Sequence, residues 1–232
     1  MTHYIGVVPA RSGSKGLPNK NMAMCGGAPL VHWTLNAAKQ SEHLSEVFLT
    51  SDSREILNYA ESQGVDAHLR PDRAATDRAT AADVVGEFIE FLKSEGRDLK
   101  STSLVYLQPT SPLRTSTHID ACIKEMESAG FSSAVSLVDV ESKYWKLWEK
   151  KGRAVAALFR TRTNANRQQL PSLFLPNGAI YIFQVSDFMR FNGFPNDECF
   201  GYVMESTDSV DIDVYSDLER VEAILNERIY SQ

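Results

Sequence analysis

The chain has 232 residues, of which 43% are hydrophobic and 23% charged, and its formal net charge is −6. This composition is typical of a globular protein with enough apolar material for a core, and the negative charge argues against a general nucleic-acid binder. We expect one domain over residues 1–232, in which any polyanionic ligand must be met by a local basic cluster.

Segments with strand and helix patterns alternate from the first residues onward. Strands are predicted at residues 4–8, 46–50, 65–69, 103–108, 133–138 and 178–183, and helices at 29–39, 54–63, 80–94, 116–128 and 215–229. Repeated βα units of this length imply an α/β fold with a mainly parallel sheet and helices on both faces. Right-handed crossovers would then bring together the residues that follow three of these strands, namely Arg11, Lys15, Lys20, Ser51, Asp52 and Gln108.

The cysteines and the apolar runs indicate where such a chain resides. Cys25, Cys122 and Cys199 are far apart and form no C-x-x-C pair. We therefore expect neither a disulfide framework nor a zinc site, and we predict a cytoplasmic location. No leader pattern and no run of transmembrane length is found, so no membrane partner is expected. The five histidines are scattered, and we interpret them as structural or surface residues.

The first strand leads into the segment VPARSGSKGLPNKN, residues 8–21. Glycines such as Gly13 and Gly16 let backbone N–H groups turn toward an anion, and Arg11, Lys15 and Lys20 add positive charge. The segment is neither a P-loop nor a dinucleotide fingerprint. A surface turn with solvated lysines is the alternative, but the position after the first strand of an α/β sheet favours a phosphate-binding loop.

Near the other end of the chain, residues 209–213 read SVDID. The alternation places Asp211 and Asp213 on the same side of an extended segment. Two carboxylates on one side suit Mg²⁺, which prefers hard oxygen ligands and also takes phosphate oxygens. A solvated acidic edge strand is the alternative, and the basic loop shifts the balance toward the metal.

Two further segments carry groups suited to a sugar acid. In LQPTSPLR, residues 107–114, prolines stiffen the loop, and Gln108 and Ser111 offer donors and acceptors to a sugar. Arg114 either pairs with an anion or anchors the following helix. The arginines between residues 160 and 177 offer a planar fork to a carboxylate.

The βα rhythm stops near Asp139. Trp145 and Trp148 follow, and Gly152 is predicted to be the turn of a hairpin between residues 145–150 and 153–159. The tryptophans need a surface to cover. They either pack back on the same chain or form a contact with a second copy, since aromatic residues and arginine are enriched at interfaces.

Taken together, the sequence resembles the acylneuraminate cytidylyltransferases. The resemblance rests on PARSGSKGLPNKN, LTSD, LRP followed by Thr76-Asp77, LQPTSPLR, RQQLP followed by PNGAIYI, and SVDIDV, and it spans nearly the whole chain. It implies a Rossmann-like sheet of the nucleotide-diphospho-sugar transferase type with a dimerisation extension at residues 139–176. It also implies Mg²⁺-dependent transfer of CMP from CTP to the anomeric hydroxyl of a nine-carbon 2-keto sugar acid, with N-acetylneuraminate as the default, and release of pyrophosphate.

The same resemblance implies roles for individual residues. Nucleotide contacts fall on Arg11, Ser14, Lys15, Lys20, Asn21, Arg70 and Thr80, and metal ligands on Asp211 and Asp213. The sugar acid falls on Gln108, Arg160 and Arg167, with the arginines reaching the active site of the partner in a homodimer; the spacing leaves Arg162 as an alternative to Arg160. Arg11, Lys20 and Asp211 are the expected catalytic residues, and Asp211 or a metal-bound water would take the proton.

Several alternatives share most of these motifs. A related nine-carbon acid (legionaminic, pseudaminic or deaminated neuraminic acid) is one. An eight-carbon octulosonate or a sugar phosphate is another. A nucleotide-binding homologue that has lost the reaction is a third, and the intact basic loop and acidic pair argue against it.

Overall fold

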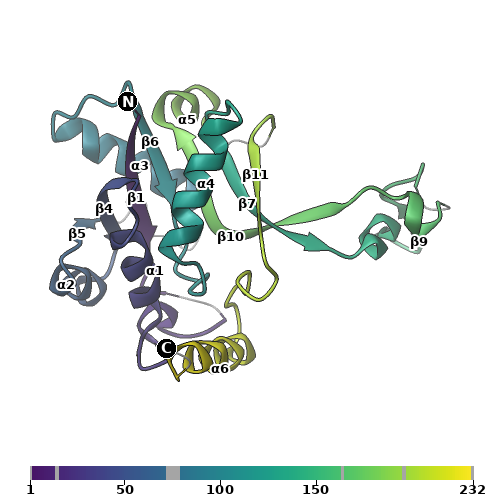
Figure 1. Ribbon diagram of the computed structural model, residues 1–232, viewed down its shortest axis with the longest axis horizontal. Coiled ribbons are helices and arrows are strands. Elements are labelled where there is room, and N and C mark those ends of the chain that lie inside the picture. Colours follow the sequence, from purple (N-terminus) through teal and green to yellow (C-terminus); the bar gives the residue numbers. More distant parts are fainter. Residues whose placement is uncertain (1, 14–15, 72–78, 163–164, 195–196, 231–232) are drawn as a thin grey trace.

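The computed structural model describes residues 2–13, 16–71, 79–162, 165–194 and 197–230. Its centre is a seven-stranded sheet in the order β11-β7-β10-β6-β1-β4-β5 (Figure 1). The strands are β1 (His3–Pro9), β4 (Leu44–Ser51), β5 (Asp66–Leu69), β6 (Thr102–Tyr106), β7 (Ala134–Val140), β10 (Leu173–Gln184) and β11 (Phe200–Met204). Strand β10 runs antiparallel to its neighbours β6 and β7, and the other pairings in the sheet are parallel. The predicted fold class is thereby confirmed.

Helices cover both faces of this sheet. One apolar cluster joins the sheet to α1 (Leu30–Lys39), α2 (Arg54–Ser62) and α4 (Ser116–Ser128). A second cluster joins the opposite face to α3 (Ala81–Ser94) and α5 (Val185–Phe191). A third cluster packs α6 (Tyr215–Tyr230) against Val210 and Ile212. Helix α6 lies beyond the carboxyl ends of the parallel strands (Figure 1).

The helix starts follow the signals in the sequence. The Ser53 side chain accepts a hydrogen bond from the Ile56 N–H and caps α2. Thr80 and Thr115 each form a capping box at the start of α3 and α4. Other details differ from the prediction: α5 was not foreseen, and β10 is longer than residues 178–183. Residues 209–213 belong to no strand, although Val210 and Ile212 are buried and the aspartates exposed as the alternation predicts.

Strand β10 carries an irregularity where it crosses the carboxyl edge of the sheet. Its pairing with β7 shifts register between Pro176 and Tyr181. Gly178 has φ 76°, a left-handed conformation that favours glycine. Inside the shift, Ser136 of β7 replaces the missing ladder bonds: its hydroxyl donates to Asn177 Oδ1 at 2.6 Å and accepts from the Ile180 N–H at 2.7 Å. The bulge therefore presents Asn177 and Gly178 at this edge.

The ends of β7 and β10 continue into an arm that projects from the core (Figure 1). Beyond them lie η3 (Ser142–Lys146), the hairpin β8 (Trp148–Lys151) and β9 (Ala154–Ala157), and η4 (Arg167–Gln169). The predicted hairpin is confirmed, with Gly152 at φ 65° in its turn, but it is shorter than expected. Three more short elements, η1 (Lys20–Met22), β2 (Met24–Cys25) and β3 (Ala28–Pro29), precede α1.

One tryptophan of the arm packs back on the chain, and the other faces outward. The Trp145 Nε1 donates to the Pro171 carbonyl at 2.9 Å, and its ring meets Phe159 edge to face. Trp148 and Val155 in the hairpin are 55% and 61% exposed. The interpretation that the tryptophans pack back on the chain is therefore confirmed for Trp145, and a contact of Trp148 with a second copy stays a prediction. Among the described residues, no helix is both long enough and apolar enough to cross a membrane.

Candidate active site

The predicted site residues follow strands that end at one edge of the sheet. Strands β1, β4, β5 and β6 run parallel, so the segments after Pro9, Ser51, Leu69 and Tyr106 lie at the same edge. These segments carry Arg11, Asp52, Arg70 and Gln108. The placement of Arg11, Asp52 and Gln108 agrees with the predicted convergence, whereas Lys15, part of the same prediction, lies outside the described residues.

Two residues that were predicted to contact the nucleotide bind the main chain of the basic loop. The Arg70 guanidinium donates to the Ala10 carbonyl at 2.9 Å. The Asn21 side chain donates to the Arg11 carbonyl at 2.8 Å. Both side chains are buried, so they fix the start of the loop from the interior of the protein. Ser14 and Lys15, also predicted here, lie outside the described residues.

Lys20 connects the basic loop to the acidic segment. Its ammonium donates to the Ile212 carbonyl at 2.6 Å and lies 3.4 Å from Asp213 Oδ1. The loop also approaches this segment at Gly16, where a Cβ would lie 2.3 Å from the Asp213 carbonyl oxygen. Only glycine permits so close a backbone approach. The two motifs that the sequence singled out are thus in direct contact.

Asp211 and Asp213 are both exposed to solvent, but the surroundings of Asp211 disfavour its charge. Desolvation, followed by repulsion from Asp213 and Asp217, raises the pKa of the Asp211 carboxyl, against the opposing effects of Thr110 and Lys20. A divalent cation would supply the missing positive charge. The described residues contain no group of three or more His, Cys, Asp or Glu that could hold a metal. Two carboxylates suit Mg²⁺ when water and phosphate oxygens supply the other ligands, and a magnesium site at Asp211 and Asp213 stays a prediction.

Gln108 faces the bulge of β10. A Cβ on Gly178 would lie 2.7 Å from Gln108 Oε1, and the Ser111 hydroxyl donates to the Asn177 carbonyl at 3.3 Å. The half-buried Gln108 side chain of the LQPTSPLR loop therefore lies against β10, at the edge where Lys20 and Asp213 also lie. This is a suitable place for a polar ligand group beside the basic loop.

Arg114 fixes the LQPTSPLR loop to the core. It is 1% exposed, and its NH1 donates to the carbonyls of Gln108 and Ala179 at 3.2 and 2.8 Å. Burial lowers the pKa of its guanidinium to about 9. Of the two interpretations offered by the sequence, the structure favours the structural one, because this side chain binds backbone carbonyls in the interior.

Arg70 and Thr80 occupy different environments. Arg70 is 6% exposed, and burial lowers the pKa of its guanidinium, while the nearby Asp52, Tyr106 and Glu87 act in the opposite direction. Thr80 is exposed and forms the capping box of α3, in which its N–H donates to Asp83 Oδ2 at 2.7 Å and its hydroxyl accepts from the Asp83 N–H. A nucleotide contact of Thr80 stays a prediction.

The arginines of the arm lie apart from this edge. Arg160 and Arg162 follow the hairpin at the far end of the arm, which leads away from the core (Figure 1). The Arg162 guanidinium lies 4.2 Å from the centroid of the Trp145 ring, a cation–π contact within the arm. Arg160 is exposed. Arg167 opens the short turn η4, and its side chain lies outside the described residues.

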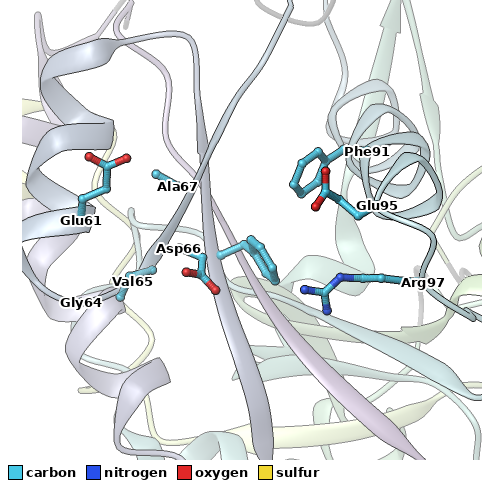
Figure 2. A pocket seen from close by; sticks show the side chains of 9 residues that line it. Glu61, Gly64, Val65, Asp66, Ala67, Phe91, Glu95 and Arg97 are labelled. Carbon is cyan, nitrogen blue, oxygen red and sulfur yellow. The ribbon is translucent and has the colours of Figure 1, made fainter.

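A hollow elsewhere on the molecule is separate from this site. It has a volume of about 620 Å³ and lies beside the edge strand β5, between the ends of α2 and α3 (Figure 2). Its polar lining is mostly acidic, with Glu61, Asp66 and Glu95 beside Arg97. As far as the described chain shows, its lining contains none of the predicted site residues, and its charge does not suit a polyanion.

Some residues that build the site were not singled out from the sequence. Ser209 accepts from the Asn177 side chain at 2.9 Å and donates to the Glu205 carbonyl, which fixes the start of the acidic segment. Ser136, the partner of Asn177 in the bulge, is a polar residue in an apolar strand. That polar residue in an apolar strand was the one feature of the sequence that could have indicated the bulge.

The sequence of this chain is similar to those of known cytidylyltransferases. The sequence profile described as cytidylyltransferase matches residues 5–169. An N-acylneuraminate cytidylyltransferase of Escherichia coli is 36% identical over 220 residues, which are 94% of this chain and 51% of that protein. One from Streptococcus agalactiae is 32% identical over 219 residues, 93% of this chain and 51% of that protein. A CMP-N,N'-diacetyllegionaminic acid synthase of Legionella pneumophila is 29% identical over 225 residues, 95% of each chain.

Two solved structures share the fold. A CMP:2-keto-3-deoxy-manno-octonic acid synthetase complexed with CTP has a TM-score of 0.74 and 14% identity, covering 98% of this chain and all of that chain. A 4-diphosphocytidyl-2C-methyl-D-erythritol synthase has a TM-score of 0.68 and 12% identity, covering 97% of this chain and all of that chain. This chain spans about half the length of the first two curated relatives. Because the family profile matches most of the chain, and the motifs meet at one edge of the expected fold, this chain belongs to the cytidylyltransferase family.

Proposed function

We propose that the protein transfers CMP from CTP to the anomeric hydroxyl of a nine-carbon 2-keto sugar acid and releases pyrophosphate. The observation that carries the proposal is the contact of Lys20 with Ile212 and Asp213, which joins a basic loop to a pair of carboxylates. In the proposal, the charges that bind the triphosphate would lie beside the carboxylates that bind its cation, and this contact supports that arrangement. The printed names of the relatives support a sugar acid as the acceptor.

The residues divide the chemistry between them. Lys20 and Arg11 stabilise the negative charge that develops on the departing pyrophosphate. The Asp211 carboxylate, or a water molecule bound to the metal, would take the proton of the attacking hydroxyl. Asp211 and Asp213 would hold Mg²⁺, which would polarise the phosphoryl oxygens when bound.

A second copy of the chain completes the acceptor site in this proposal. Gln108 contributes from the core, and Arg160 and Arg167 belong to an arm that points away from its own site. The arm exposes apolar side chains, including Leu147, Trp148 and Val155. A homodimer that covers them would bring the arginines of each arm to the partner's sugar acid.

The dimer is tested by sedimentation of the unmodified protein and of Val155→Glu. We expect a dimer for the former and a monomer with little activity for the latter. Lys100→Glu, a charge change at an exposed core position, is the control and should stay dimeric. If the unmodified protein sediments as a fully active monomer, the proposal of a shared site is wrong.

The three cysteines are unpaired, which supports a cytoplasmic location.

N-acetylneuraminate is the first candidate substrate, and N,N'-diacetyllegionaminate is the second. The names of the Escherichia coli and Streptococcus agalactiae relatives support the first, and the name of the Legionella relative, which is 29% identical over 225 residues, supports the second. Pyrophosphate release from CTP and Mg²⁺ should be measured with both acids, pseudaminate, a deaminated neuraminate and an eight-carbon octulosonate. Turnover with a nine-carbon acid is expected. CTP binding without turnover of any acid would identify an inactive homologue.

A further inference from the structure

The basic loop is tied to the neighbouring strand by a single carboxylate. Ser12 donates two hydrogen bonds to Asp52, from its backbone N–H to Oδ1 and from its hydroxyl to Oδ2, each 2.8 Å long. Ser12 follows β1, and Asp52 follows β4. Because the carboxylate receives both donors of one residue, it fixes the main chain and the side chain of Ser12 together.

Two other side chains hold the residues just before Ser12. As described above, Arg70 donates to the Ala10 carbonyl and Asn21 donates to the Arg11 carbonyl. Three consecutive residues are therefore each held by a side chain from a different segment of the chain. Arg11, the first cation of the loop, lies in the middle of this stretch, so its backbone position depends on all three contacts.

The charge of Asp52 is unfavourable for a polyanion site. A fixed carboxylate beside the loop repels the phosphates of a nucleotide. It also lies near enough to Arg70 to oppose the effect of burial on that guanidinium. If charge were the whole contribution of Asp52, the residue would weaken nucleotide binding. Its contribution must therefore come from the two hydrogen bonds to Ser12.

We propose that Asp52 is a positioning residue, which holds residues 10–12 in the shape that presents the loop to the triphosphate of CTP. This inference rests on the proposed function. It predicts that CTP binding depends on a hydrogen-bond acceptor at position 52 and tolerates the loss of the charge.

The test compares Asp52→Ala, Asp52→Asn, Ser12→Ala and the double variant Ser12→Ala/Asp52→Ala in the full chain. The control is Glu90→Gln, which removes an exposed carboxylate that pairs with Lys93 on α3. Calorimetry gives the Kd for CTP, and steady-state kinetics give KM for CTP and for the sugar acid separately. Thermal unfolding verifies that each variant is folded.

We expect Asp52→Ala to weaken CTP binding about tenfold, the loss of a hydrogen bond to a charged group. Asp52→Asn should stay within about threefold of the unmodified protein, because its amide oxygen still accepts from the Ser12 N–H. The double variant should bind no more weakly than Asp52→Ala, because both changes remove the same contact. KM for the sugar acid should not change.

The inference is wrong if Asp52→Ala binds CTP as well as or better than the unmodified protein. It is also wrong if the losses of CTP affinity in Ser12→Ala and Asp52→Ala add in full in the double variant, or if Asp52→Asn loses as much affinity as Asp52→Ala. Turnover by the unmodified protein with unchanged CTP affinity across the series would overturn only this inference. CTP binding that follows the predicted series without turnover of any acid would overturn only the proposed function. Absence of CTP binding by the unmodified protein would overturn both.

Discussion

Replacement of Lys20 by methionine tests whether the basic loop acts on the reaction or only on binding. The change keeps the aliphatic stem and removes the ammonium, which donates to the Ile212 carbonyl and lies 3.4 Å from Asp213. At saturating CTP, Mg²⁺ and sugar acid, we expect the maximal rate of pyrophosphate release to fall by about 100-fold or more. That factor corresponds to about 2.7 kcal/mol of lost transition-state stabilisation.

The same change costs some stability, and the structure bounds that cost. The Asp213 side chain is 77% exposed, so its ion pair with Lys20 contributes at most about 1 kcal/mol. The partly buried hydrogen bond to Ile212 adds about 1.5–3 kcal/mol, as expected for a charged donor. Urea unfolding should therefore show a loss within the sum of these ranges, small enough for the assay to be run on folded protein.

Lys39→Met is the matched control. The Lys39 ammonium on α1 also donates to a backbone carbonyl, that of Gln63, but it lies outside the candidate site. This variant should lose a comparable amount of stability or less and keep its maximal rate. The reasoning fails if Lys20→Met raises the Kd for CTP while the maximal rate stays unchanged, because the ammonium would then act on binding alone.

The remaining predictions concern the acidic segment, the loop and the arm. Asp211→Asn should lower turnover by at least about 100-fold. Because the pKa of Asp211 is raised in the folded protein, its ionisation opposes folding, so at neutral pH without Mg²⁺ the variant should melt at a higher temperature. The difference should disappear below about pH 4, where the carboxyl is protonated in both folded and unfolded chains. Gly16→Ala should abolish CTP binding in calorimetry, since the Asp213 backbone cannot yield to a Cβ at 2.3 Å; normal affinity would contradict the loop geometry. Arg160→Ala should raise KM for the sugar acid about tenfold or more. Arg162→Ala should mainly lower the melting temperature, because Arg162 already stacks on an aromatic ring of its own arm. The reverse pattern would exchange the roles of the two arginines.

Local patterns account for the parts of the fold that were predicted. Helix α4 begins and ends at residues 116 and 128, as predicted from the apolar spacing. Helix α5 escaped prediction because its seven residues are too few for a helical period to stand out. The extension of β10 into the arm was missed for another reason: residues 173–176 gain their strand character from pairing with β7 across a register shift, which no local pattern reports.

By itself, the sequence determined that the sheet is mainly parallel and that the residues after its strands meet at one edge, because periodicity and the alternation of strands with helices are visible along the chain. It also determined that Asp211 and Asp213 point to the same side. Only the tertiary structure decided which side chains touch there. Lys20 meets Ile212 across 192 positions of sequence, and Ser12 meets Asp52 across 40. Such contacts depend on the relative placement of separate segments, and hydrogen bonds between residues far apart in the chain leave no periodic pattern in the sequence.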